Sequence, residues 1–172
     1  SRDGRWLFVT ISNAARSEVY FRDLKAPPPA AAKEAQASPT LAAGFTPLAV
    51  GRDAHYYAGA FKNKIYLFSD DGAPRGQLFV VDPKKPAREH WKLLVPERKD
   101  STLEGFQIVG GHLSLTYQRD VVNYVEVRKL DGSLPREVPL PGLGSSSGLF
   151  GREDEDEAYF SFTSFIQMPQ IF

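Results

Sequence analysis

The repetition of two strand types along the chain limits the possible folds more than any other feature. One type ends in an acidic turn, and its acidic residues Asp23, Asp82 and Asp131 lie about 59 and 49 residues apart. An aromatic-rich strand precedes each of these, and four such strands begin near Trp6, Ile65, Leu113 and Tyr159. A β-propeller blade has four antiparallel strands in about 45 to 50 residues, which is the period of this repeat. The sequence therefore predicts an all-β fold, a partial β-propeller of about three and a half four-stranded antiparallel blades.

The same repeat predicts where each blade begins and ends. Turn-forming pairs such as Asp-Gly, Asn-Lys and Gly-Gly separate short β-branched or aromatic runs, which are typical of strands. The first interval is longer because it contains an Ala/Pro-rich stretch at 25–43, which we interpret as a solvated insertion. We expect blades at about 1–50, 51–97, 98–141 and 142–172, the last of them incomplete.

The last predicted blade ends on aromatic-rich strands. Strands are expected at 146–150 and 157–165, and a third is expected to begin at 170. A propeller closes because each blade packs on two neighbours, so a partial ring leaves strand edges and apolar blade faces uncovered. We therefore expect this chain to be a piece of a larger protein, to fold poorly alone and to associate through the edge near 158–172.

Composition and charge argue against several classes of protein. The chain of 172 residues has zero formal net charge, whereas nucleic-acid-binding proteins normally carry a basic stripe. No run of about eighteen apolar residues is present to span a membrane. There is no Cys, which excludes disulfides, thiolate zinc sites and a Cys nucleophile. We expect neither a nucleic acid nor a membrane as a partner.

One short motif resembles that of a serine hydrolase. GSSSG at 144–148 fits the G-x-S-x-G pattern, with Ser146 in the position of the nucleophile. That pattern requires a strand that turns sharply into a helix, so that the hydroxyl lies over an oxyanion hole. The residues that follow, LFGREDEDE, contain turn and charge signals and no helix start. We interpret the motif as a connection between the third and fourth blades.

Other candidate ligands and catalytic groups do not form a recognisable site. The three histidines, His55, His90 and His112, lie in or beside predicted strands at no metal-ligand spacing. EDEDE at 153–157 lacks the alternating ligands and central Gly of a calcium loop, and a solvated hairpin tip is expected there. We therefore expect no catalytic residue, no metal and no cofactor within this chain.

An ordered series of short motifs runs along the chain. SRDGRWLFVTIS at 1–12 is similar to an S-P-D-G-R-W strand, with Arg2 in place of Pro, and the stretch 70–105 combines APRG-L, D-P-x-x-P-A-R-E-x-W, LVPE and LEG. FSFTSFIQMPQIF at 160–172 is similar to F-x-F-T-S-F-x-x-P-x-x-I-Y. Together these stretches resemble the propeller domain of the prolyl oligopeptidase family of serine peptidases. The resemblance extends over the chain apart from the insertion at 25–43.

This resemblance implies an enzyme of two parts. The chain would be the second half of a seven-bladed propeller, joined to an α/β-hydrolase domain of the same chain that carries a Ser-Asp-His triad. The propeller would admit only short peptides, which are cut after proline, and would keep folded proteins from the active site. No catalytic residue of the family falls on this chain, and the compartment, cytoplasm or periplasm, stays open.

The resemblance also implies which turns face the substrate. With strands named a to d from the centre of a blade outward, the b–c hairpins and the d–a links lie at one face, where the hydrolase domain would sit. Asn13 and Arg16, in the first b–c loop, are the candidates for substrate-proximal residues, and Arg75 and Arg119 are candidates for the domain-interface face. The alternative is that all four are merely interface or solvent residues.

Two other functions fit parts of the sequence. The chain could belong to a non-catalytic propeller that binds a protein partner, although the Gly-His and Trp-Asp signatures of WD repeats are absent. It could also belong to a related peptidase of the oligopeptidase B or dipeptidyl peptidase type. Thr-Ser-Phe at 163–165 is closer to prolyl oligopeptidase than to oligopeptidase B, which tends toward Ser-Ser-Leu.

Overall fold

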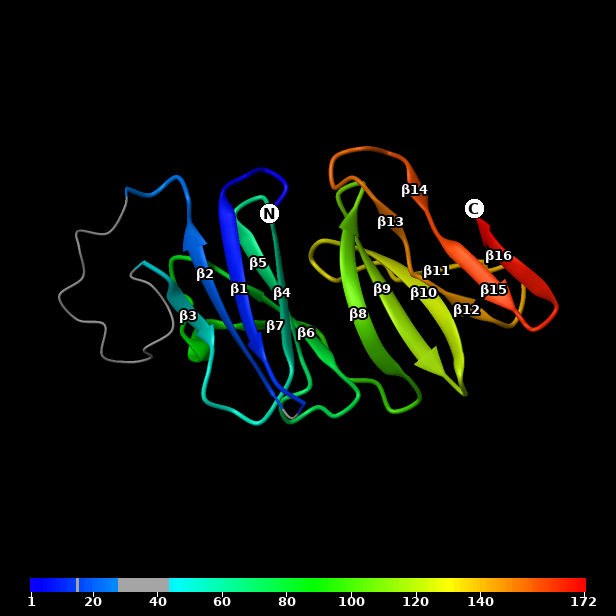
Figure 1. The fold of residues 1–172 in the computed structure, drawn as a ribbon, viewed down its shortest axis with the longest axis horizontal. Coiled ribbons are helices and arrows are strands. Elements are labelled where there is room, and N and C mark those ends of the chain that lie inside the picture. Colours follow the sequence, from blue (N-terminus) through cyan, green and yellow to red (C-terminus); the bar gives the residue numbers. More distant parts are fainter. Residues whose placement is uncertain (15, 28–43) are drawn as a thin grey trace. The chain divides into compact units, whose positions relative to one another are not determined.

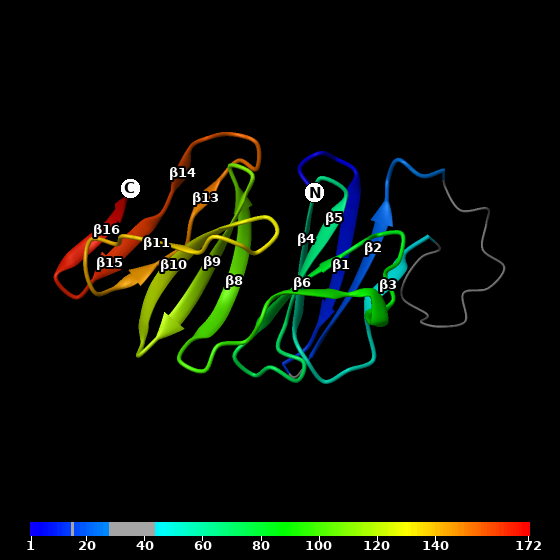
Figure 2. The same cartoon turned by 180° about the vertical axis from the view of Figure 1, so that it is seen from behind.

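The computed structural model describes residues 1–14, 16–27 and 44–172, and within them the chain is built almost entirely of β-strands (Figure 1, Figure 2). The expected insertion at 25–43 lies outside the described residues from position 28 onward. The chain divides into two compact units, one of Ser1–Asp71 with Val80–Lys92 and one of Gly72–Phe79 with Leu93–Phe172. No helix in the described ranges is long and apolar enough to cross a membrane.

Two antiparallel sheets contain the strands of the first half of the chain. One has three strands in the order β1-β2-β3, and the other has four in the order β4-β5-β6-β7. Their bounds are β1 Trp6–Ser12, β2 Ser17–Asp23, β3 Thr46–Ala49, β4 Tyr56–Phe61, β5 Lys64–Ser69, β6 Gln77–Val81 and β7 Lys92–Val95. A short 3₁₀ helix, η1 (Arg88–His90), precedes β7, and the sequence pattern did not predict it.

The second half of the chain continues in the same way. A four-stranded sheet has the order β11-β10-β9-β8, a three-stranded sheet has the order β12-β15-β16, and β13 pairs with β14. The bounds are β8 Thr102–Val109, β9 His112–Arg119, β10 Val122–Lys129, β11 Arg136–Val138, β12 Ser145–Ser146, β13 Phe150–Gly151, β14 Ala158–Tyr159, β15 Ser161–Ser164 and β16 Gln167–Ile171. The all-β prediction is confirmed, whereas the residue boundaries of the blades stay a prediction.

The inner strands of the four-stranded sheets are buried on both faces. In β5, Ile65, Tyr66 and Leu67 are at most 1% exposed, although successive side chains point to opposite faces of a sheet. In β9, Leu113 and Leu115 are fully buried, and Ser114 between them is only 3% exposed. A strand covered on both faces has a continuous apolar run in place of alternation, which explains KIYLF in β5.

Tight hairpin turns connect these strands. Phe61 pairs with Lys64 across the β4–β5 turn, so that turn has two residues, Lys62 and Asn63, whose φ angles are 46° and 60°. The β9–β10 turn is built in the same way from Asp120 and Val121, at 49° and 60°. Two consecutive positive φ angles characterise the type I′ turn, whose twist matches that of the flanking strands. Val121 is β-branched, so its left-handed backbone is strained.

The strands near the C-terminal end differ from the prediction. The strand expected at 146–150 is divided into β12 and β13, and the one expected at 157–165 is divided into β14 and β15. Gly148 has a φ of 74°, and a Cβ added there would lie 2.2 Å from Oγ1 of Thr116. The chain bends at this close approach and the strand is interrupted. The final strand also begins at Gln167, before the expected position 170.

Candidate functional site

The β1–β2 turn holds the two residues predicted to lie near substrate. Asn13 N–H donates to the carbonyl oxygen of Arg16 at 2.9 Å, and Arg16 N–H donates to Asn13 Oδ1 at 3.0 Å. The Arg16 guanidinium lies 3.8 Å from Asp53, and both side chains are exposed. A pair of this kind contributes little to stability because water screens it. Asn13 therefore shapes the turn, and Arg16 presents an exposed, weakly held positive charge beside it.

The same unit contains a strongly paired carboxylate, Asp71, shortly after β5. Arg52 Nε lies 2.5 Å from Asp71 Oδ2, Arg88 Nη1 lies 2.6 Å from it, and the Tyr56 hydroxyl donates to it at 2.8 Å. The hydrogen bond from Arg52 lowers the pKa of Asp71 to about 2, against the opposing effect of burial. The sequence did not predict this network, because Arg52 and Arg88 are distant from Asp71 in the chain and no local pattern links them.

Arg119, predicted for the domain-interface face, lines a cavity in the second unit. Its guanidinium lies over the Tyr124 ring at 4.9 Å and 3.5 Å from a carboxylate oxygen of Asp100. The cavity has a volume of about 430 Å³ and is lined by the β9–β10 turn, part of β10 and the chain near Leu143. Its polar and apolar groups could accept part of a peptide or part of another domain.

Arg75, the other residue predicted for that face, lies at a different place in the second unit. Its backbone N–H donates to Glu97 Oε1 at 2.6 Å, and its carbonyl oxygen accepts from Leu103 N–H at 2.8 Å. The residue is exposed and does not line the cavity of Arg119. The structure therefore brings Asn13 and Arg16 together on one turn, whereas it separates Arg75 from the Arg119 cavity.

A buried ion pair lies beside Tyr124, which is one of the residues that line the Arg119 cavity. Glu126 on β10 is 7% exposed, and its carboxylate contacts Arg98 at 2.7 Å and Arg128 at 2.5 Å. Arg98 also donates to the Tyr124 hydroxyl at 2.9 Å. Burial by itself would lower the pKa of Arg98, but the hydrogen bond with Glu126 raises the pKa above its usual value.

Two tyrosines pack beside this pair. The Tyr117 and Tyr124 rings stack with their centroids 5.1 Å apart, and the Arg98 guanidinium lies 4.3 Å from the centre of the Tyr117 ring. Burial raises the pKa of Tyr117 to about 12. The network thus connects the segment before β8 to β9 and β10 and holds the Tyr124 ring on which Arg119 lies.

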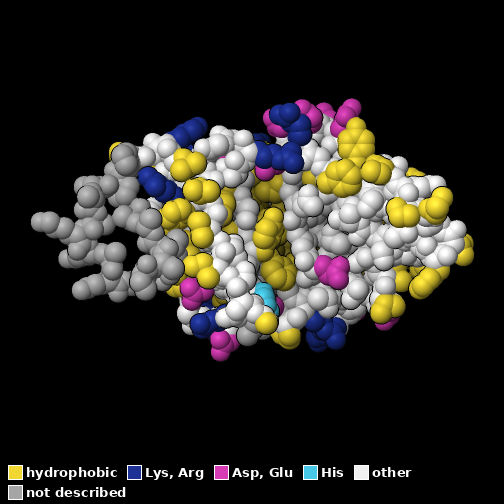
Figure 3. Space-filling model, viewed as in Figure 1, with side chains coloured by type: hydrophobic (Ala, Val, Ile, Leu, Met, Phe, Trp, Pro, Cys, Tyr) yellow, Lys and Arg dark blue, Asp and Glu magenta, His cyan; other side chains and the backbone are white. Residues whose placement is uncertain are grey.

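Large apolar side chains are exposed at the turns of the second unit. Val121 in the β9–β10 turn is 88% exposed, and Phe165 and Ile166 in the β15–β16 turn are 111% and 99% exposed. Leu143, in the link before β12, is 82% exposed, and that link is tied to β10 by a hydrogen bond from Asn123 N–H to the Gly144 carbonyl oxygen. Figure 3 shows hydrophobic side chains gathered at the β15–β16 edge, on the right of the view. We call Val121, Leu143, Phe165 and Ile166 the apolar turn tips.

The serine of the GSSSG motif lies in a strand. Ser146 is in β12 and pairs with Phe162 of β15, and its hydroxyl accepts a hydrogen bond from Gly148 N–H at 3.3 Å. Since a nucleophile elbow needs a turn from a strand into a helix, this geometry does not provide one. The motif is partly a paired strand, and the strand expected from residue 146 begins at Ser145.

The histidines have local structural contacts. His55 Nδ1 lies 2.9 Å from Asp70 Oδ2, and His112 Nδ1 lies 2.8 Å from the Gly110 carbonyl oxygen. Within the part of the chain that the structure describes, no three His, Asp or Glu side chains gather as a metal site would require. The first contact joins the start of β4 to the end of β5, and the second stays within the β8–β9 turn.

Curated relatives of this chain are prolyl endopeptidases. The enzyme from Elizabethkingia meningoseptica is 32% identical over 99% of this chain, and the one from Elizabethkingia miricola is 28% identical over 100% of it. This chain spans 22% of the length of each of these two relatives.

Solved structures share the fold. A chain from a structural study of two prolyl endopeptidases, on the role of inter-domain dynamics in catalysis and specificity, is 41% identical with a TM-score of 0.86. Apo prolyl oligopeptidase B from Galerina marginata has a TM-score of 0.78 at 14% identity. Each match covers 99% of this chain and 23% of the other. These matches confirm the predicted propeller fold.

A family model settles which family the chain belongs to. The model for the N-terminal β-propeller domain of prolyl oligopeptidase matches residues 1–172, the whole of the chain. The family that the ordered motifs predicted is thereby confirmed. This chain belongs to the family of prolyl oligopeptidase N-terminal β-propeller domains.

Proposed function

We propose that this chain is part of the substrate-gating propeller of a serine-type prolyl oligopeptidase, which cleaves short peptides after proline. The catalytic triad would lie in an α/β-hydrolase domain of the same natural chain. The names of the relatives support this proposal, since proteins 32% and 41% identical to this chain are prolyl endopeptidases. The propeller would contribute exclusion, because a folded protein cannot pass it to reach the nucleophile.

The exposure of the apolar turn tips is the strongest structural observation in support of this proposal. A turn tip in water normally has polar residues, yet Val121 occupies a strained left-handed position with its side chain 88% exposed. Strained residues of this kind are enriched at functional sites, and a group of exposed apolar side chains typically marks a surface that another domain covers. We assign the end of the second unit that carries Val121 and Phe165 to the hydrolase domain, with Arg119 among the polar groups beside it.

The β1–β2 turn is our proposal for the substrate-facing part. Arg16 has an exposed guanidinium whose pairing with Asp53 at 3.8 Å is weak, so the group can turn toward a peptide carboxylate. Asn13 would hold the turn in place through its two hydrogen bonds to Arg16. The competing role, contact with the hydrolase domain only, would leave peptide selectivity unchanged when Arg16 is replaced.

A pair of substitutions in the full-length natural protein tests the docking surface. Val121→Ser with Phe165→Ser should weaken closure of the propeller on the hydrolase domain, so that longer peptides are cut faster relative to short ones. The control is Leu134→Ser, because Leu134 is also 64% exposed with a positive φ of 54°, but lies in the β10–β11 link. A ratio of long-peptide to short-peptide kcat/KM that does not differ between the two variants would contradict the proposed docking surface.

A further inference from the structure

The first unit contains a cavity of about 670 Å³ that plays no part in the proposed gating. Its lining comes from the start of β1, the β4–β5 turn, the end of β6 and the start of β7. The charged lining residues are five cations, Arg5, Lys62, Lys64, Lys84 and Lys92, against the single carboxylate of Asp82. Since the whole chain has zero formal net charge, this excess of positive charge is a local feature.

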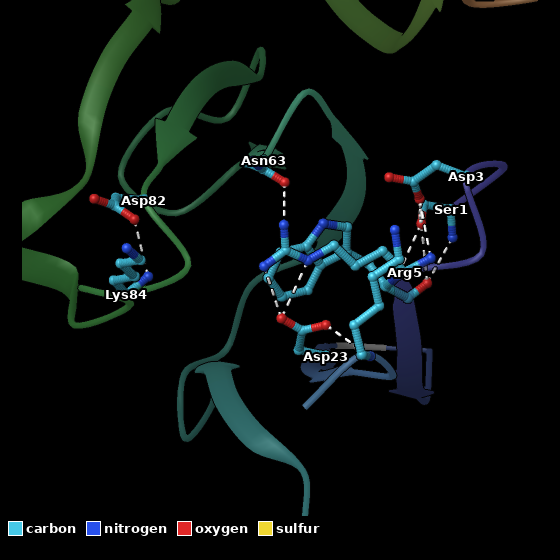
Figure 4. A network of polar contacts seen from close by, with 9 residues as sticks. Ser1, Asp3, Arg5, Asp23, Asn63, Asp82 and Lys84 are labelled. Atoms are coloured by element: carbon cyan, nitrogen blue, oxygen red, sulfur yellow. Dashed lines mark hydrogen bonds and ion pairs between the residues drawn. The ribbon is translucent and has the colours of Figure 1, made fainter. Parts of the chain in front are cut away.

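Arg5 is fixed at one wall of this cavity. Its Nε and Nη2 groups donate to Asp23 Oδ2 at 3.1 and 2.8 Å, and its Nη1 group donates to Asn63 Oδ1. Figure 4 shows the Arg5 side chain between Asp23 and Asn63, with Asp82 and Lys84 on a neighbouring segment. The Arg5 charge is thus largely neutralised, and its contacts hold the β4–β5 turn against the end of β2.

The lysines of the cavity supply the uncompensated charge. Lys62 and Lys64 come from the β4–β5 turn, Lys84 follows β6, and Lys92 begins β7. All four are exposed, and none of them forms an ion pair with a carboxylate of the described residues. Like charges from three separate segments repel one another, so a multivalent anion bound among them would remove an unfavourable interaction.

The cavity also borders a buried donor that lacks a partner. Trp6 lines it, is 5% exposed, and has a buried indole Nε1–H with no hydrogen-bond acceptor among the described residues. Leaving such a donor unsatisfied is unfavourable, and an acceptor oxygen that reached it would remove that cost. The cavity therefore combines excess positive charge with an unsatisfied donor in a residue of its wall.

We propose that this cavity binds a small polyanion that carries two or more phosphoryl groups. A phosphoryl group offers several strong acceptor oxygens and more than one negative charge, so a linked pair can reach lysines from different segments at once. A single carboxylate carries one charge and would leave most of the lysines uncompensated. The volume of about 670 Å³ also suits a compact molecule better than an extended acidic peptide.

This inference is independent of the proposed gating function. The cavity is lined by the β4–β5 turn and the β6–β7 link, whereas the residues assigned to substrate lie in the β1–β2 turn at the other ends of the strands. Loss of phosphate binding would leave the gating proposal unaffected, and failure of the gating test would leave this site unaffected.

The test is isothermal titration of the full-length natural protein with tripolyphosphate, pyrophosphate, citrate and a short oligoglutamate. We expect tripolyphosphate to bind more tightly than citrate or oligoglutamate. The variant Lys64→Gln with Lys84→Gln should bind tripolyphosphate about tenfold more weakly or worse. The matched control is Lys99→Gln with Lys129→Gln, which removes two exposed lysines of the second unit and should bind as the unaltered protein does.

Three results would overturn the proposal. Equal loss of affinity in the cavity variant and the control would mean that only overall charge matters. Tighter binding of citrate or oligoglutamate than of tripolyphosphate would mean that the site is not selective for phosphoryl groups. No heat of binding with any of the anions, together with unchanged thermal unfolding when tripolyphosphate is added, would mean that no such site exists.

Discussion

A few single carboxylates connect segments that are far apart in the sequence. Asp71 joins Arg52, Tyr56 and Arg88, and Glu126 joins Arg98 and Arg128. In both cases the acid is largely buried while its cationic partners reach it from more exposed positions. Removing the acid therefore leaves two or three groups without their partner at once.

The pH dependence of stability should reveal the role of Asp71. Its pKa is lowered in the folded state, so the stabilisation is fully present above the usual value of 3.8 and is lost as pH falls toward about 2. Asp71→Asn should lower the free energy of unfolding by about 1–2 kcal/mol at pH 7, with a smaller difference at pH 3. Urea unfolding at the two pH values measures this, and an equal loss at both would contradict it.

Replacement of Glu126 should be more costly. Glu126→Gln leaves Arg98 and Arg128 beside a neutral, largely buried amide, which should cost about 3 kcal/mol in the free energy of unfolding. The control is Glu137→Gln, because Glu137 lies opposite Glu126 in the β10–β11 ladder but is exposed, and should cost about 0.5 kcal/mol or less. Urea unfolding in which the two variants lose the same stability would show that the Arg98 network is not a source of stability.

At the level of strands, the close approach at Gly148 decides where the strand is interrupted. Gly148→Ala would place a methyl group 2.2 Å from Thr116 Oγ1 at a positive φ, and should cost about 3 kcal/mol. Gly72→Ala is the control, because Gly72 has a φ of 68° with no atom within 4 Å of the added Cβ, and should cost about 1 kcal/mol. Thermal unfolding that ranks the two variants equally would contradict the steric account.

Local patterns explain which strands could be predicted from the sequence. The hairpins β4–β5 and β9–β10 follow from apolar runs and turn residues that lie next to each other in the chain, and the strands expected near Ile65 and Leu113 are β5 and β9. The division of the last strands depends on contact between Gly148 and Thr116, and the position of η1 depends on packing of Trp91 and Arg88 near Tyr56. These contacts link distant parts of the sequence, so no short stretch of sequence predicts the strand break or the position of η1.

The same distinction applies to the candidate site. The turn that holds Asn13 and Arg16 could be predicted because it lies between two strands with clear sequence patterns. The ordered motifs indicated the family. The Arg119 cavity depends on Asp100, Tyr124 and Leu143, which come from three separate segments. The cavity of about 670 Å³ in the first unit is also lined by four separate segments. The zero net charge of the whole chain gave no sign of its local excess of lysines.

At the scale of the whole molecule, the proposed function requires a propeller that excludes folded proteins and a hydrolase domain that carries the catalytic triad. The chain spans 22–23% of the length of the relatives, so the proposed gating has to be measured in the full-length protein. Gating would use two parts of this chain, the apolar turn tips of the second unit and the exposed Arg16 of the first.

The most direct test compares cleavage of one proline-containing sequence in three forms by the full-length natural protein. The forms are a short peptide, the same peptide with Ala in place of Pro, and the same sequence in a loop of a stable folded protein. The account predicts cleavage of the first alone, after the proline, with loss of activity on treatment with a serine-directed inhibitor. Cleavage of the folded protein at a similar rate, or no cleavage of any form, would contradict the central claim.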